Sequence, residues 1–124
     1  MTQEDKQLLL KDLCERVPYG VKINENTQGD FTVIGLTTER VFTTCETEGC
    51  HNDFPIDCIK PYLFPLSSMT EEQKNEYQYI AERWMYDPSY SISDSTDWLN
   101  KNHFDYRGLI EKGLAIDATG LNVY

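Results

Sequence analysis

Three of the five prolines in this chain fall in one short stretch, Phe54 to Thr70 (FPIDCIKPYLFPLSSMT). Proline interrupts regular structure, because it removes a backbone donor and fixes φ. The sequence before this stretch reads mainly as short strands and turns, and the sequence after it as helices and aromatic loops. The stretch is also too apolar for a flexible linker, which would be rich in Gly, Ser or charge. We therefore predict that it packs as a seam between two unlike halves, with Ile59 and Leu63 facing the sheet and Phe64 or Leu66 facing the helical half.

The half before the seam predicts one helix followed by a small antiparallel sheet. Thr2 is a suitable N-cap, leucines recur at helical spacing through Leu13, and Pro18-Tyr19-Gly20 ends the helix. Alternating or β-rich runs follow, separated by short polar connections of the kind found in hairpins. The predicted strands cover residues 21–23, 31–36, 40–45 and 54–56, the last confined to an edge by its proline.

The half after the seam predicts helices. Thr70 and Gln73 form a capping-box pattern at the start of a helix that should run to about Met85. Its apolar stripe consists of Tyr77, Ile80, Ala81 and Trp84. Two shorter helices are expected over residues 96–102 and 106–112.

Together these patterns predict an α+β fold in one domain over residues 1–124. Residues 1–66 form a helix plus a small sheet, and residues 67–124 form a helical, aromatic-rich half packed on it. A Src-homology-3-like barrel is an alternative arrangement of the strands, while a simple sheet with a covering helix is the preferred one.

The formal net charge of −10 argues against direct binding to nucleic acid, because its eleven basic residues are scattered and form no run. The acidic excess is spread evenly over both halves. Eight tyrosines and two tryptophans supply side chains that favour contact surfaces.

The N-terminus, MTQEDKQ, is acidic and polar, unlike a secretory signal, and no apolar run approaches the roughly 20 residues of a membrane span. Four cysteines without a regular framework favour reduced thiols. We therefore expect a cytoplasmic protein with no membrane contact.

Thiol and imidazole groups gather between residues 45 and 58, where Cys45, Cys50, His51 and Cys58 could bind zinc. The spacing lacks a Cys-x-x-Cys pair and matches no common zinc knuckle, so idle thiols are the preferred interpretation and no cofactor is expected. His51 directly follows Cys50, which also disfavours a Cys–His dyad.

A second polar group, His103, Asp105 and Arg107, could serve acid–base chemistry and hold an anion. The preferred interpretation is structural, with Asp105 capping a helix and Arg107 pairing locally. The chain contains no glycine-rich phosphate loop, no G-x-S-x-G and no H-E-x-x-H motif.

Three segments resemble a known group of proteins: LLLKDLCERVPYGVKI, IKPYLFPLSSMTEEQK and HFDYRGLIEKGLAIDATGLNVY. The group consists of short, uncharacterised proteins of gut anaerobes and their prophage-like mobile elements. The resemblance covers about half the chain and implies a bacterial or phage-related cytoplasmic protein. It carries no activity, ligand or site residue.

The leading hypothesis is a non-enzymatic interaction module with a protein partner. An acidic inhibitor that mimics nucleic acid is the first alternative, motivated by the charge. A small enzyme using His103, Asp105 and Arg107 is the second, and it requires these side chains to converge in one pocket.

Overall fold

The computed structural model describes residues 1–44 and 51–124. The chain begins with α1 (Gln3–Arg16), where the Thr2 hydroxyl accepts a hydrogen bond from the Asp5 amide, 3.1 Å away. A short 3-10 turn, η1 (Val17–Tyr19), follows, and Gly20 leaves it with a positive φ of 71°. Both ends of this helix were predicted from the sequence, and both are confirmed.

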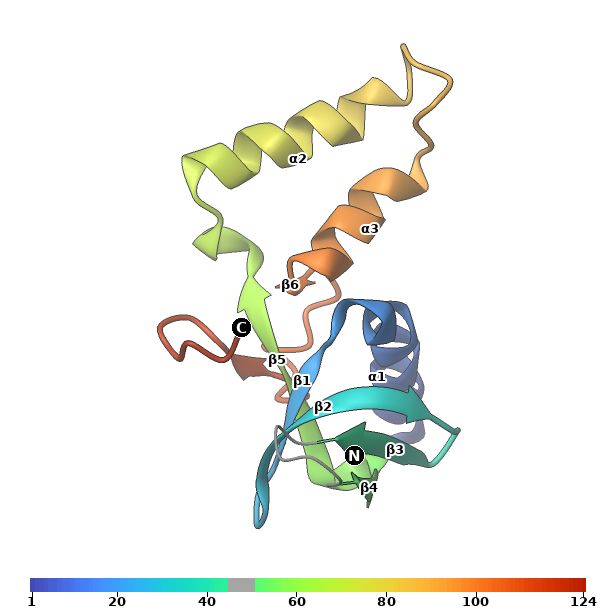
Figure 1. Ribbon diagram of the computed structural model, residues 1–124, viewed down its shortest axis with the longest axis vertical. Helices are drawn as coiled ribbons and strands as arrows, with labels where there is room; N and C mark the ends of the chain where they lie inside the picture. The colour runs from blue at the N-terminus through green and yellow to red at the C-terminus, as the bar shows by residue number, and fades with distance from the viewer. Residues whose placement is uncertain (45–50) are drawn as a thin grey trace.

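An open sheet of mostly antiparallel strands follows α1 (Figure 1). Its long strands are β1 (Lys22–Glu25), β2 (Gly29–Leu36), β3 (Arg40–Thr44), β4 (His51–Pro55) and β5 (Ile59–Pro65). Their order is β4-β3-β2-β1-β5, and each neighbouring pair is antiparallel. The Glu25 carboxylate holds the turn between β1 and β2 by accepting the backbone amides of Thr27 and Gln28.

Helix α1 covers one face of this sheet and closes the main hydrophobic core (Figure 1). Leu9 and Leu13 of the helix are fully buried, as are Ile23 and Val41 of the sheet. Burying side chains of this kind contributes about 1.5–3 kcal/mol each, so this layer stabilises the fold more than any polar contact in it. The remaining buried members of this core are Val21, Phe31, Val33, Phe54, Ile56, Ile59, Leu63, Leu109, Leu114 and Ala115.

The predicted seam consists of η2 (Ile56–Cys58), β5 and η3 (Leu66–Ser68). Ile59 and Leu63 lie in the main core, as expected. Phe64, near the end of β5, packs instead against a second apolar cluster formed by Trp98, Leu99 and Phe104. Leu66 is exposed, so of the two alternatives predicted for the contact with the helical half, Phe64 forms it and Leu66 does not.

Two antiparallel helices extend from the sheet as a hairpin (Figure 1). Helix α2 (Glu71–Arg83) carries the predicted capping box, with both reciprocal hydrogen bonds between Thr70 and Gln73 present. Helix α3 (Ser93–Lys101) returns toward the sheet and buries Trp98 and Leu99. No residue of α2 is fully buried, so this helix depends on one-sided packing against α3.

The prediction of an α+β fold is confirmed, but the Src-homology-3-like barrel is wrong because the sheet is open. Strand β5 lies between β1 on one side and two short strands, β6 (Phe104–Asp105) and β7 (Ile116–Asp117). Both run parallel to β5 and come from the C-terminal segment. They occupy the edge that a closing strand would need, and β4 remains at the opposite edge of the described sheet.

The prediction of a helical C-terminal half is also wrong beyond Lys101. Residues 102–124 form turns and the strands β6 and β7, and the helix expected over 106–112 does not form. Gly108 and Gly113 adopt positive φ angles of 75° and 74°, which break a helix. Within the described residues, no helix is both long and apolar enough to cross a membrane.

Candidate functional site

The most heavily bonded polar cluster joins α1 to the C-terminal segment. Asp12 and Arg16 of α1 are completely buried and form an ion pair, with 2.8 Å between Arg16 Nε and Asp12 Oδ2. Arg16 Nη2 also donates to the Phe104 carbonyl at 2.6 Å. Arg107 Nη1 donates to Asp12 Oδ1 at 2.8 Å from the partly exposed side. One buried carboxylate therefore lies between two guanidinium groups.

Glu15 extends this cluster toward the surface. It accepts hydrogen bonds from Arg107 Nη2 at 2.6 Å and from the Tyr106 hydroxyl at 2.7 Å. Burial would raise the pKa of Glu15, but the hydrogen bonds from Arg107 and Tyr106 outweigh it and hold that pKa below its ordinary value. The guanidinium carbon of Arg107 lies over the Tyr106 ring, 4.6 Å from the ring centroid. These contacts hold Arg107 in a structural role.

Asp105 is buried, and its carboxylate is occupied by backbone donors. Oδ1 accepts the Leu109 amide at 3.0 Å, and Oδ2 accepts the Ile110 amide at 2.9 Å. This is the capping contact expected for Asp105, although it closes a turn rather than a helix. Both oxygens of the Asp105 carboxylate are therefore engaged by the backbone of this turn.

His103 is buried at 8% exposure and adopts a positive φ of 62°. Its ring stacks on the ring of Tyr124, with centroids 3.7 Å apart. Burial, followed by the nearby charges of Arg16 and Lys22, lowers the pKa of His103 to about 4. His103 Nδ1 has no hydrogen-bond partner among the described residues. The ring is therefore neutral at physiological pH and shielded from water.

The three residues of the proposed acid–base group thus have separate environments. His103 stacks on Tyr124, Asp105 holds a turn, and Arg107 binds carboxylates of α1. Among the described residues, no hydrogen bond or ion pair joins any two of these three side chains. The three residues are neighbours in the sequence, but their side chains contact different parts of the structure and do not form one site.

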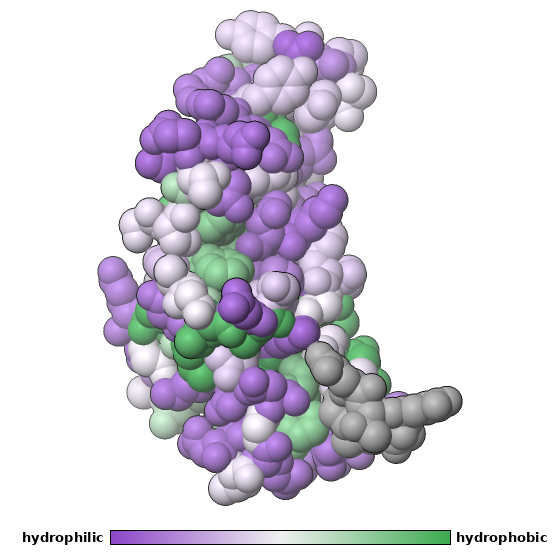
Figure 2. Space-filling view, turned by 60° about the vertical axis from the view of Figure 1, so that its left-hand side comes forward, coloured by the Kyte–Doolittle hydropathy of each residue, from purple (hydrophilic) through white to green (hydrophobic). Residues whose placement is uncertain are grey.

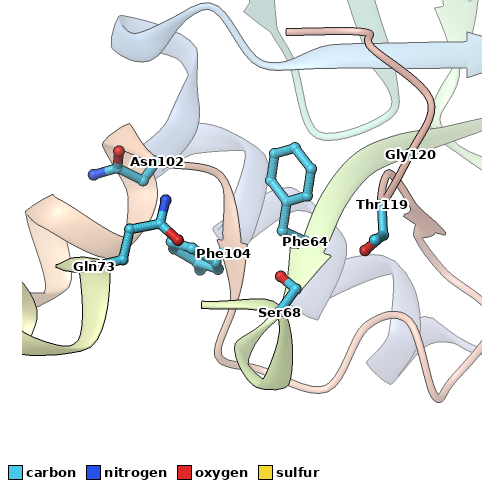
Figure 3. Close-up of a pocket in the computed structure, with 7 residues that line it drawn as sticks. All are labelled: Phe64, Ser68, Gln73, Asn102, Phe104, Thr119 and Gly120. Carbon is cyan, nitrogen blue, oxygen red and sulfur yellow. The ribbon is translucent and has the colours of Figure 1, made fainter. Parts of the chain in front are cut away.

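A cavity of about 200 Å³ lies beside this region, where the end of β5, the start of α2 and the C-terminal loop meet (Figure 3). Figure 3 shows the rings of Phe64 and Phe104 and the amide of Gln73 at its wall. The other lining residues are Ser68, Asn102, Thr119 and Gly120. The Ser68 hydroxyl already donates to the Pro65 carbonyl at 2.7 Å. The described lining contains no titratable side chain that could serve as a general acid or base.

The zinc hypothesis rests partly on residues that lie outside the described part of the chain, namely Cys45 and Cys50. The other two members are described, and both are exposed: His51 begins β4, and Cys58 ends η2. In residues 1–44 and 51–124, no group of three or more metal-ligating side chains comes together.

Five exposed large apolar side chains belong to the α2–α3 hairpin, whose far end lies at the top of Figure 1. We call this group the hairpin tip, and it consists of Tyr79, Trp84, Met85, Tyr86 and Ile92. Tyr86 is 77% exposed and Ile92 is 68% exposed. Figure 2 shows the same end of the molecule, where pale side chains of intermediate hydropathy lie among hydrophilic ones. Exposed aromatic groups of this size are typical of contact surfaces.

The loop of the hairpin tip is held by its own hydrogen bonds. Asp87 Oδ1 accepts both the amide and the hydroxyl of Ser89, at 2.9 and 2.7 Å. Asp94 Oδ2 accepts the Ser91 amide at 2.7 Å. The backbone and side-chain hydrogen bonds from Ser89 lower the pKa of Asp87, so these two hydrogen bonds persist at neutral pH.

The sequence assigned Trp84 to the buried stripe of α2, and this assignment is wrong. Tyr77 and Ile80 do pack on α3, with the Tyr77 and Trp98 rings 5.7 Å apart. Trp84 is 44% exposed because the facing start of α3 is polar (SDSTD) and offers it no apolar partner. That polar pentapeptide is the sequence signal that would have placed Trp84 on the surface.

Comparison with protein-family models, with curated protein sequences and with solved structures finds no match to this chain. The candidate site therefore rests on the geometry described above.

Proposed function

We propose that this protein is a non-enzymatic, cytoplasmic interaction module whose contact surface is the hairpin tip. Its origin in a bacterium or a prophage-like element stays a prediction from the sequence resemblance. The observation that carries the proposal is the exposure of five large apolar side chains at one protruding end of the molecule.

The composition of the hairpin tip supports binding. Trp and Tyr, together with Met, are enriched at protein interfaces, and Trp and Tyr often supply most of the binding energy. Trp84, Met85 and Tyr86 are consecutive, and all three are exposed. Leaving them in water costs free energy that a partner would recover by covering them.

Binding rather than catalysis is supported by the occupancy of the polar groups. Asp105 and Arg107 are held by structural partners, and the lining of the cavity beside Phe64 offers no acid–base group. A catalytic site needs a titratable group within reach of a substrate.

Site-specific photo-cross-linking tests the proposal. A photoreactive phenylalanine analogue replaces Tyr86 in one variant and Tyr19, which is exposed on η1, in a matched control. Both full-length variants are irradiated in extract of an organism that encodes the chain. We expect one defined adduct from position 86 and none from position 19. Equal labelling from both positions, or no adduct from either, would contradict the proposal.

The acidic nucleic-acid mimic is the second candidate, and one observation favours it. Residues 71–97 contain seven acidic and two basic residues, a net charge of −5 out of −10 for the chain. A mimic would bind through carboxylates alone. Replacing Trp84 and Tyr86 by serine would then leave binding unchanged, whereas an interaction through the hairpin tip would be lost.

A further inference from the structure

We propose that the hairpin tip binds a protein segment that presents arginine or lysine beside an apolar side chain. This inference rests on the proposed function, and it adds the chemical class of the partner. It combines the exposed aromatic groups of the hairpin with the charge that surrounds them.

The hairpin that carries the tip is acidic. Five of the acidic residues in 71–97 are exposed, namely Glu71, Glu72, Glu76, Glu82 and Asp97. Glu82 lies at the end of α2 next to the tip, whereas Glu71 and Glu72 lie at the opposite end of that helix. The two basic residues of the same range are Lys74 and Arg83, and Lys74 already lies 3.6 Å from the Glu71 carboxylate. Such a surface attracts cationic partners and accelerates their approach.

One contact within the hairpin is an example of how an aromatic ring of this surface binds a guanidinium group. The guanidinium carbon of Arg83 lies over the Tyr79 ring, 5.0 Å from its centroid. Stacking of this kind stabilises by about 0.5–1 kcal/mol at exposed sites and more when water is excluded. Trp84 and Tyr86 offer two further exposed rings, and arginine stacks on such rings better than lysine.

The loop that carries these rings is already ordered by the Asp87 and Asp94 hydrogen bonds. A pre-ordered loop loses little conformational entropy on binding, so the contact energy of its aromatic side chains is available to the complex.

The same charge argues against two other occupants. A second copy of this chain in a symmetric dimer would place the net −5 of residues 71–97 against an identical charge. A nucleic acid would bring phosphates to the acidic side chains, whereas phosphate binding needs clustered arginine and lysine. A basic protein segment is the partner that matches both the rings and the carboxylates.

The test is a selection of random linear peptides displayed on phage against the immobilised full-length chain. Selected peptides are then synthesised, and their affinities are measured by isothermal titration calorimetry. We expect enrichment of peptides in which arginine or lysine neighbours an aromatic or aliphatic residue. Raising the salt to about 0.5 M NaCl should weaken their binding, because exposed charge pairs are screened.

Two double variants locate the binding surface. Trp84→Ser with Tyr86→Ser should lower the affinity at least about tenfold, as expected for aromatic anchors. Ile34→Ser with Phe42→Ser, which changes exposed apolar residues of the sheet, is the matched control and should leave the affinity unchanged. Circular dichroism checks that both variants remain folded.

The outcomes separate this inference from the proposed function. Peptides that depend on Trp84 and Tyr86 but are neutral or acidic would overturn the basic partner and retain the contact surface. Peptides unaffected by the Trp84 and Tyr86 substitutions would overturn both. Concentration-dependent dimerisation that the same double variant abolishes would identify a second copy as the occupant and overturn the inference.

Discussion

The ring of Tyr124 stacks on the imidazole of His103, with centroids 3.7 Å apart and planes inclined by 10°. The Tyr124 hydroxyl donates to the Tyr62 carbonyl at 2.8 Å and accepts the Lys22 amide at 2.9 Å. This contact attaches the C-terminal segment to β1 and β5. Burial is the largest cause that raises the pKa of Tyr124, to about 12, so its hydroxyl stays protonated at any physiological pH.

The His103–Tyr124 stack predicts a pH-dependent stability. Burial lowers the pKa of His103 from 6.5 to about 4 in the folded protein, so the unfolded chain binds this proton first on acidification. The free energy of unfolding should therefore fall as the pH drops from 6.5 toward 4. Urea denaturation measured across this window checks the expected loss.

Carboxylates also titrate in this window, so the contribution of His103 is isolated by substitution. His103→Asn removes the imidazole while tolerating the positive φ of 62°, which Asn adopts more readily than most residues. The slope of stability against pH between 4 and 6.5 should become shallower in this variant. His51→Asn, at the exposed histidine of β4, is the control, and an equal change in its slope would refute the assignment.

The ion pairs of Arg107 should contribute far more than an exposed ion pair. Arg107→Met leaves the buried Asp12 carboxylate with Arg16 alone and should lower the free energy of unfolding by about 2–4 kcal/mol. Arg40→Met removes the exposed pair with Asp53 and should cost less than about 1 kcal/mol. Guanidinium chloride denaturation compares the two, and similar losses would show that burial does not strengthen the Arg107 contacts.

The capping box at Thr70 should control the local stability of α2. Since no residue of α2 is fully buried, this helix should open more easily than the main core. Thr70→Ala should cost about 1 kcal/mol, which lowers the hydrogen-exchange protection of α2 about fivefold. Thr2→Ala, at the N-cap of α1, should leave the protection of α2 unchanged. Equal protection of α2 in the wild type and Thr70→Ala would contradict the prediction.

The acidic surroundings of Trp84 should be visible by fluorescence quenching. Trp84 is 44% exposed and Trp98 is 8% exposed, so a soluble quencher reaches mainly Trp84. Relative to free N-acetyltryptophanamide at equal ionic strength, caesium should quench the Trp84 emission more strongly and iodide more weakly, because the local potential is negative. Trp84→Phe should remove most of the quenchable emission. Quenching by iodide that is enhanced relative to this reference would argue against a negative surface at the hairpin tip.

Local signals in the sequence were reliable wherever one short segment contains all the interacting groups. The caps of Thr2 and Thr70 and the helix end at Gly20 follow from neighbouring residues, and all three appear in the structure. The antiparallel order of β1 to β3 follows from short connections in the same way. Ile59 and Leu63 of the seam were correctly assigned to the core.

The sequence by itself therefore determined α1, α2 and α3, the hairpin connections and the apolar character of the seam. Only the tertiary structure decided the rest. Strands β6 and β7 pair with β5 on the side that β1 leaves free, and the sheet stays open. Arg107 donates a hydrogen bond to Asp12, 95 residues away in the sequence. The segment around Arg107 forms a turn instead of the expected helix. Trp84 lost its expected burial because only the start of α3 faces it, and that start (SDSTD) is polar. The pairing of β5 and the contact of Arg107 with Asp12 depend on groups distant in sequence, whose meeting no local pattern encodes.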